Sequence, residues 1–122
     1  MPGPELLLSI RHDTQFGPLA MVGAGGTLVE LLHDVASAPA PLSHEAALRM
    51  VRGLRVARML DAWRGHPARD IAAVVDALVR LSWLAVDLGA RLVDLEINPL
   101  IAGSVGAGVR AVDLRVEWAG PQ

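Results

Sequence analysis

RLVDLEINPLIA, residues 91–102, and VRAVDLRV, residues 109–116, are the two stretches that decide the fold. Apolar and polar residues alternate along both, and a period of two predicts β-strands with one apolar and one polar face. The loop between them is short and contains Gly103 and Gly106, so the two strands are expected to form an antiparallel hairpin. In the first strand, the predicted apolar face holds Val93, Leu95 and Ile97, and the predicted polar face holds Asp94, Glu96 and Asn98.

The rest of the chain places further strands before helices. Aliphatic runs bounded by Gly and Pro predict the strands, and apolar residues at helical spacing predict the helices. Ser43 is a predicted helix N-cap, and Gly89 is a predicted helix end. We expect strands over 5–11, 19–22 and 27–32, a flexible loop over 23–26, an irregular connection around 39–41, and helices starting at Ser43 and covering 56–63 and 68–88. This order predicts one α+β domain over residues 1–122, with an antiparallel β-sheet and helices packed on one face.

Composition excludes several classes of protein. With 52% hydrophobic residues the chain is a folded domain, and its formal charge of -2 gives no basic stripe for nucleic acid. It has no cysteine, no basic segment that would start a signal peptide and no apolar stretch long enough to span a membrane, which fits a cytoplasmic protein. All 11 basic residues are Arg. Any Lys that binds nucleotide phosphates must therefore come from another segment or chain.

The polar face of the hairpin is the first candidate site. A turn centred near residues 104–105 would place Glu96 opposite Asp113, with Asn98 one diagonal step away. Like charges that face each other across strands are destabilising unless a cation neutralises them, and Mg²⁺ takes carboxylate and amide oxygens. Mg²⁺ held by one or two protein groups normally also binds nucleotide phosphates. The pattern therefore predicts a site for Mg²⁺ and a nucleotide, while a strand face that simply meets water remains the alternative.

A glycine-rich stretch is the second candidate. Gly23, Gly25 and Gly26 could let backbone N–H groups approach a phosphate closely. They could equally form an ordinary hairpin loop, because the stretch lacks the Lys-Ser/Thr of a P-loop and does not clearly open a helix. The four His residues do not cluster, so we assign none of them a role.

Taken together and in order, these motifs resemble a known family. The chain is similar to the C-terminal part of the ATP-grasp domain of NDP-forming acyl-CoA synthetases, the acetate–CoA ligase type, which are relatives of the succinyl-CoA synthetase beta subunit. The resemblance covers about residues 5–116. The motifs that support it are RHDTQFGP (11–18), GAGG (23–26), Val29-Glu30, Asp34, Ala40-Pro41-Leu42, DLEINPL (94–100) and AVD (111–113).

The resemblance implies a reaction and a metal site. The family interconverts an acid, CoA and ATP with an acyl-CoA, ADP and phosphate, through an acyl phosphate and a phosphohistidine, and holds the Mg-nucleotide between two lobes. By resemblance, Asn98 and Asp113 are magnesium ligands and Glu96 supports them or binds the metal through water. Arg11 is implied as a catalytic contact to phosphate or phosphohistidine.

The resemblance also implies nucleotide contacts and partners. Gly25, Gly26 and Glu30 match the family element that lies near the nucleotide phosphates or structures that loop. The first ATP-grasp lobe and the CoA-binding and phosphohistidine domain are expected elsewhere, in the same full-length chain or in a separate subunit. We also expect a homo-oligomer. A non-catalytic regulatory or interaction module, as in acetyltransferase-fused sensors, is the alternative function, and the intact set of metal ligands favours the ligase.

Overall fold

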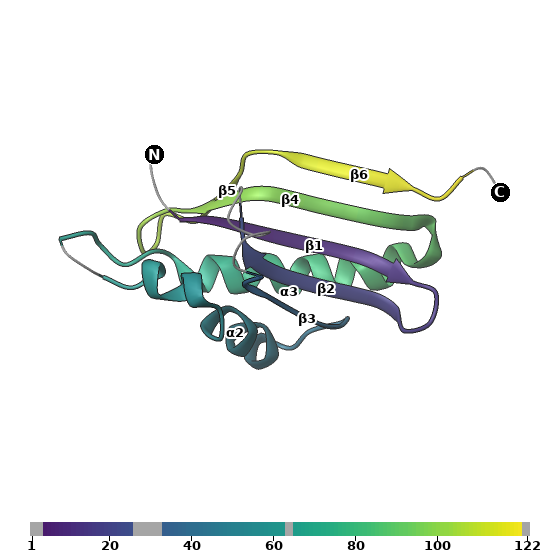
Figure 1. Ribbon diagram of the computed structural model, residues 1–122, viewed down its shortest axis with the longest axis horizontal. Helices are drawn as coiled ribbons and strands as arrows, with labels where there is room; N and C mark the ends of the chain where they lie inside the picture. Colours follow the sequence, from purple (N-terminus) through teal and green to yellow (C-terminus); the bar gives the residue numbers. More distant parts are fainter. Residues whose placement is uncertain (1–3, 26–32, 63–64, 121–122) are drawn as a thin grey trace.

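The computed structural model describes residues 4–25, 33–62 and 65–120, in which the strands form one six-stranded antiparallel sheet. The main path of the sheet is β3-β2-β1-β4-β5, and β6 also pairs with β4 (Figure 1). The strands are β1 (Glu5–Asp13), β2 (Gly17–Ala24), β3 (Val35–Pro39), β4 (Leu92–Ala102), β5 (Val109–Ala111) and β6 (Leu114–Trp118). The helices are α2 (His44–Arg52), α3 (Ile71–Leu88) and two 3-10 helices, η1 (Arg55–Leu60) and η2 (Gly89–Arg91).

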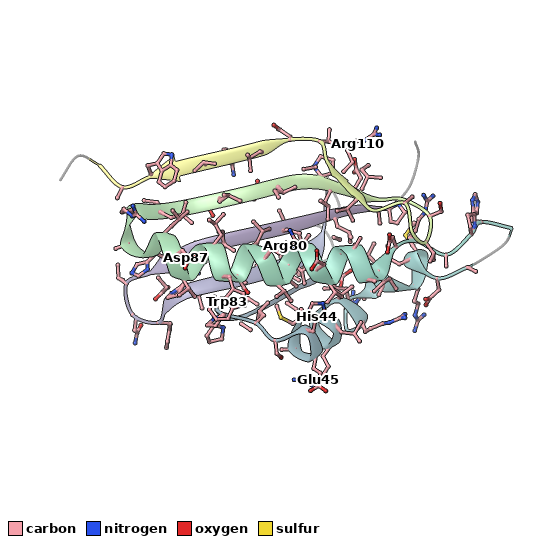
Figure 2. All side chains as sticks on the ribbon, turned by 180° about the vertical axis from the view of Figure 1, so that it is seen from behind. His44, Glu45, Arg80, Trp83, Asp87 and Arg110 are labelled. Atoms are coloured by element: carbon pink, nitrogen blue, oxygen red, sulfur yellow. The ribbon has the colours of Figure 1, made fainter. Side chains whose placement is uncertain are left out.

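The helices cover one face of the sheet, and the core lies between the two layers. Figure 2, seen from behind, shows α3 running along the strands in front of the sheet, with Trp83 on its outward side. Leu6, Leu8 and Ile10 of β1 are fully buried beneath it. They point to the helical face because alternate residues of a strand share a face. The predicted α+β class with helices on one face is confirmed.

Two helix ends were predicted correctly from local capping residues. The Ser43 side chain accepts a hydrogen bond from the backbone N–H of Ala46, so α2 begins where its N-cap was expected. Gly89 ends α3 with a φ of 55°, a conformation that glycine adopts without strain. The predicted start of this helix near residue 68 is wrong by about one turn, because Asp70 is the N-cap and Ile71 is the first helical residue. None of the helices within the described residues is long and apolar enough to cross a membrane.

Three other boundaries differ from the predictions. Residues 35–39 form strand β3, although Pro39 suggested an irregular connection, because proline is tolerated on an edge strand. Gly23 and Ala24 belong to β2 rather than to a flexible loop. The second short helix is a 3-10 helix that ends at Leu60. The strand expected over 27–32 lies outside the described residues.

The predicted C-terminal hairpin forms, with a different register and with its second strand divided into β5 and β6 at residues 112–113. Glu96 is opposite Arg115, and the position opposite Asp113 is Asn98. The prediction was wrong by two residues because the turn is centred near 105–106, where Gly106 has a φ of 84° and Ala107 donates its backbone N–H to the carbonyl of Ser104. A shift of two residues keeps the paired side chains of Leu95, Glu96 and Ile97 on their predicted faces.

Val93 is an exception to the predicted apolar face. Its exposed fraction is 40%, whereas Leu92 is buried, because the pairing of β4 with β6 shifts by one residue between Leu92 and Asp94. This irregularity acts as a β-bulge and turns Val93 away from the core. Leu95 and Ile97 face the core as predicted.

Candidate functional site

The sheet face without helices, which we call the polar face, brings charged side chains together from three neighbouring strands. Cross-strand pairing places Arg11 of β1 opposite Asp94 of β4, and Glu96 of β4 opposite Arg115 of β6. Residues that are directly opposite in an antiparallel pair share a face. The polar face is defined by Ser9, Arg11, Asp94, Glu96, Arg115 and Glu117.

Glu96 lies at the centre of this face and is held by an ion pair. Its Oε2 lies 3.1 Å from Nη2 of Arg115. The Glu96 side chain is 27% exposed and the Arg115 side chain is 73% exposed, so the pair is open to solvent on the arginine side. On the other flank, Glu96 neighbours the buried Ser9 of β1. Arg115 was not identified from the sequence, because the predicted register placed Asp113 opposite Glu96.

Asn98 and Asp113 meet at an interruption of the hairpin. The backbone N–H of Asn98 donates to the carbonyl of Asp113 at 3.1 Å, and the backbone N–H of Val112 donates to the carbonyl of Pro99 at 3.0 Å. The Asn98–Pro99 peptide bond is cis, and residues 112–113 separate β5 from β6. The backbone hydrogen bond thus brings Asn98 of β4 next to Asp113, which lies in the link between β5 and β6.

Arg11 shares the polar face with the acidic residues and lies at a different level along it. It pairs with Asp94, four residues before Asn98 on β4. At the usual rise of a strand this separates Arg11 from the Asn98 level by about 13 Å. Beside Arg11, Nδ1 of His12 is buried and has no hydrogen-bond partner among the described residues. Arg11 and the Asn98–Asp113 hydrogen bond therefore lie at different levels along β4.

Gly25 has a structural constraint of its own. A Cβ atom at this position would lie 2.6 Å from the carbonyl oxygen of Leu6 and 2.9 Å from the Leu6 nitrogen, distances that real Cβ atoms do not reach. The close approach allows the N–H of Gly25 to donate to the carbonyl of Glu5 at 2.7 Å. Only glycine permits this contact with β1. The other two candidates in this segment, Gly26 and Glu30, lie outside the described residues.

Asp70 supports the turn next to the candidate site and was missed in the sequence. Its Oδ1 accepts from the N–H of Ala73 at 3.1 Å, and its Oδ2 accepts from Gly108 at 2.8 Å and from Gly106 at 3.1 Å. These N–H groups, led by that of Gly108, hold the pKa of Asp70 below its usual range. An Asp directly before an apolar helical run is an N-cap signal, but the link to a turn more than 30 residues later has no local signature.

Asp34 is a second buried carboxylate without a predicted role. It is 5% exposed, and its two side-chain oxygens accept from the N–H groups of Arg55 at 2.7 Å and Val56 at 2.8 Å. Its backbone carbonyl accepts from Ala24 at 2.9 Å. Asp34 therefore joins β2 to the start of η1, and both of its oxygens are used in holding the fold.

The donor set fits a hard cation that shares its coordination with another ligand. No group of three His, Asp or Glu side chains within the described residues forms a metal-binding cluster. Asn98, Asp113 and Glu96 supply one amide and two carboxylates, which are the oxygen donors that Mg²⁺ accepts. Because Mg²⁺ usually keeps waters and takes phosphate oxygens, so small a set is sufficient for it.

Two concavities among the described residues lie away from the predicted site. One concavity of about 260 Å³ lies against β5 and includes Arg110, and a second of about 540 Å³ lies at the end of α2 and includes Arg52. Neither is lined by a residue predicted for the site. The described residues thus provide one wall of a site.

Comparison with known proteins identifies a family that matches nearly the whole chain. A family model described as an ATP-grasp domain matches residues 1–117. Acetate–CoA ligase (ADP-forming) I of Archaeoglobus fulgidus is 38% identical over 114 residues, which are 93% of this chain and 16% of that protein. The beta subunit of acetate–CoA ligase (ADP-forming) II of Pyrococcus furiosus is 34% identical over 115 residues, 94% of this chain and 49% of the subunit. The chain thus spans half or less of the length of these relatives.

Solved structures agree with the sequence matches. The dinucleotide-forming acetyl-coenzyme A synthetase 1 of Ca. Korarchaeum cryptofilum, in complex with coenzyme A and Mg-AMPPCP, superposes with a TM-score of 0.90 at 36% identity. The match covers 98% of this chain and 55% of that one. PH1788 from Pyrococcus horikoshii also gives a TM-score of 0.90, at 30% identity, over 99% of this chain and 51% of that one.

Proposed function

The chain belongs to the ATP-grasp family, and from that premise we propose that it is the Mg-nucleotide-binding lobe of an ADP-forming acyl-CoA synthetase. The complete enzyme would join a carboxylic acid to CoA with the conversion of ATP to ADP and phosphate. The relatives named as acetate–CoA ligases support the reaction class, and the structure in complex with Mg-AMPPCP supports the ligand.

The observation that supports this function most directly is the backbone hydrogen bond from Asn98 to the carbonyl of Asp113, which holds the two residues next to each other. An amide and a carboxylate at neighbouring positions can bind one cation together. Glu96 lies on the same face of β4, two residues before Asn98, so its carboxylate can reach the cation directly or through water. The bound cation would neutralise negative charge on the nucleotide phosphates.

The length of the polar face suits an extended anionic ligand. Asn98 and Asp113 would hold the metal-bound end of a phosphate chain. Arg11, about 13 Å along the sheet, would bind a more distant phosphate group or a phosphorylated side chain of a partner domain. The planar guanidinium of arginine makes paired hydrogen bonds with phosphate oxygens, and its charge persists at all working pH values. Arg11 therefore has the chemistry to position the transferred phosphoryl group.

Other parts of the site would come from residues outside these 122. No helix of the described residues covers the polar face (Figure 1), and the chain contains no Lys to clamp the phosphates. We propose that a first ATP-grasp lobe covers the polar face and that a CoA-binding domain with the phosphohistidine acts with it. The occurrence of relatives both as fused chains and as beta subunits supports this division of the enzyme.

A chimeric enzyme tests the proposal. This chain would replace the matched segment of the Pyrococcus furiosus beta subunit, which would then be assembled into its complete ligase. We expect Asp113→Asn and Asn98→Ala to raise the Mg²⁺ concentration that gives half-maximal acyl-CoA formation by about tenfold or more, because each removes a direct ligand. Asp76→Asn, on the exposed side of α3, is the control and should have no effect. Wild-type activity of both site variants at limiting Mg²⁺ would refute the metal assignment.

A further inference from the structure

Within the part of the chain that the structure describes, strand β6 pairs with β4 alone and its outer edge is open. It is the outermost strand beside β4 in Figure 1. The N–H of Asn98 donates to the carbonyl of Asp113, and the N–H of Ala119 donates to the carbonyl of Arg91. The backbone polar groups of residues 113 and 119 therefore point toward β4. Backbone groups alternate in direction along an antiparallel strand. Leu114, Val116 and Trp118 therefore point their N–H and C=O groups away from β4 and into solvent.

The side chains of β6 are unusual for an edge that meets only water. Leu114, Val116 and Trp118 lie on the helical side of the sheet, opposite Ile97, Leu95 and Leu92 respectively. Leu114 is 56% exposed and Trp118 is 57% exposed. Exposed apolar side chains on an unpaired edge strand favour pairing with another strand.

The sequence LRVEW, residues 114–118, is complementary to itself when two copies run antiparallel about Val116. Leu114 then faces Trp118 of the other copy, and Val116 faces its own equivalent. On the opposite side of the sheet Arg115 faces Glu117 of the other copy, and this happens twice because the arrangement is two-fold symmetric. Apolar residues thus meet apolar residues, and each charge meets its opposite.

The direction of the backbone fits the same arrangement. Hydrogen-bonded positions in an antiparallel pair occur at every second residue. A two-fold axis at Val116 makes the outward-pointing residues 114, 116 and 118 the hydrogen-bonded positions of the new pair. Both the side-chain pattern and the peptide directions therefore select the same register.

We propose that two copies of this chain associate through β6, with antiparallel pairing centred on Val116 that extends the sheet across the dimer. The pairing would also supply a cation to Glu117, which lies opposite Asp94 on β4 and faces a like charge within its own chain. Arg115 of the second copy is the group that reaches it. This inference does not depend on the proposed function, since the polar face remains uncovered in the dimer.

The other long edge of the sheet does not favour association. Strand β3 contains Pro39, which has no N–H to donate to a further strand. The other side chains of β3 are small. Pairing there would bury little apolar surface. Of the two long edges of the sheet, β6 is therefore the better surface for association of two copies.

The symmetry has a consequence for the site. A two-fold axis through an antiparallel pair is perpendicular to the sheet, so the polar faces of both copies lie on the same side of the extended sheet. Each copy keeps its own Asn98–Asp113 pair, and a first ATP-grasp lobe could cover each polar face from that side. The dimer contact and the nucleotide site therefore use different surfaces of the same sheet.

Sedimentation equilibrium on the 122-residue chain, at concentrations up to about 1 mM, tests the proposal. We expect the wild type to form a dimer. Val116→Pro removes an N–H that points away from β4, so it should leave the fold intact by circular dichroism and raise the dimer dissociation constant by about tenfold or more. Ser37→Pro, at an outward-pointing position of the β3 edge, is the matched control and should still dimerise. A monomeric wild type, or a Val116→Pro variant that dimerises as well as the wild type, would overturn the proposal.

Reversing the charge at residue 115 or 117 tests the register of the proposed pairing. Arg115→Glu alone would set two carboxylates against each other at both charged contacts of the dimer, and Glu117→Arg alone would set two guanidinium groups against each other there. Each folded variant should therefore be monomeric. An equal mixture of the two variants restores both opposite-charge pairs and should form a heterodimer. Recovery of dimer only in the mixture supports pairing centred on Val116. Equal dimerisation of the separate variants and the mixture would rule out this register.

Discussion

Nη2 of Arg115 lies 3.1 Å from Oε2 of Glu96, so a carboxylate proposed for the metal site is already paired with a cation of its own chain. The two residues are directly opposite on β6 and β4. A metal ion that binds Glu96 directly must compete with this guanidinium. At the proposed site the ion pair would affect metal affinity more than the stability of the fold, because a pair this exposed contributes only about 0–1 kcal/mol to folding.

Arg115→Gln should therefore lower the Mg²⁺ concentration required by the chimeric enzyme. Loss of about 1 kcal/mol of competition corresponds to a shift of up to about fivefold. Glu96→Gln should shift the requirement in the opposite direction, since an amide is a weaker ligand than a carboxylate. Activity as a function of Mg²⁺ concentration, at saturating ATP, measures both. A shift in the same direction for the two variants would contradict competition at Glu96.

Gly25→Ala should destabilise the fold itself. The added methyl group would lie 2.6 Å from the carbonyl oxygen of Leu6, so the chain must move away from β1 and lose the hydrogen bond from Gly25 to Glu5. Overpacking of this kind costs about 1–3 kcal/mol. Urea unfolding followed by circular dichroism measures the loss. Gly120→Ala is the control, because no atom lies within 4 Å of the added carbon. Unchanged stability of Gly25→Ala would contradict this steric constraint.

Features decided by neighbouring residues were predictable from the sequence. Ser43 and Gly89 begin and end helices because a hydroxyl can accept a nearby N–H and glycine can adopt a positive φ, and both signals are local. The alternation along residues 91–102 likewise identified β4 and the opposite faces of Leu95 and Glu96 correctly, because a period of two depends only on adjacent residues.

Features decided by distant contacts were not predictable. The turn of the C-terminal hairpin is held by Asp70, which binds the N–H groups of Gly106 and Gly108 from the start of α3. No pattern within residues 103–108 reveals that contact, so the predicted register was wrong by two residues and Arg115 was overlooked. The bulge that exposes Val93 depends on pairing between β4 and β6, so it likewise could not be predicted from the sequence. The roles of the site residues themselves remain predictions.

The pH dependence of folding should reveal the contribution of Asp70. Backbone N–H groups lower its pKa in the folded state, so its ionised form is favoured by folding. The stabilisation is fully present above the unfolded pKa of about 3.8 and is lost as the pH falls through the lower folded value. Asp70→Asn replaces one accepting oxygen with a donor group. The variant should be less stable than the wild type at pH 7, and the difference should shrink below about pH 4.

Unfolding in urea at a series of pH values measures this difference. Asp13 also has a lowered pKa, because its side chain accepts from the N–H groups of Phe16 and Gln15, so the wild type loses stability in acid from more than one group. The difference in unfolding free energy between wild type and Asp70→Asn isolates the contribution of Asp70. Asp76→Asn, which removes an exposed partner of Arg80, should show no such pH dependence. A constant gap between wild type and Asp70→Asn from about pH 7 to about pH 3 would refute the assignment.

The 122-residue chain alone should form no detectable acyl-CoA from acid, CoA and ATP. Catalysis of phosphoryl transfer is mostly a matter of positioning and charge stabilisation, and both require groups on every side of the phosphates. Here the proposed ligands belong to one sheet and its links, and the chain has no Lys to place opposite them. An assay of thioester formation with the purified chain, run beside the chimeric enzyme as the positive control, decides the question. ATP-dependent acyl-CoA formation by the chain that is lost in Asp113→Asn would show that one wall of the site is sufficient, and the proposed need for a second lobe would then be wrong.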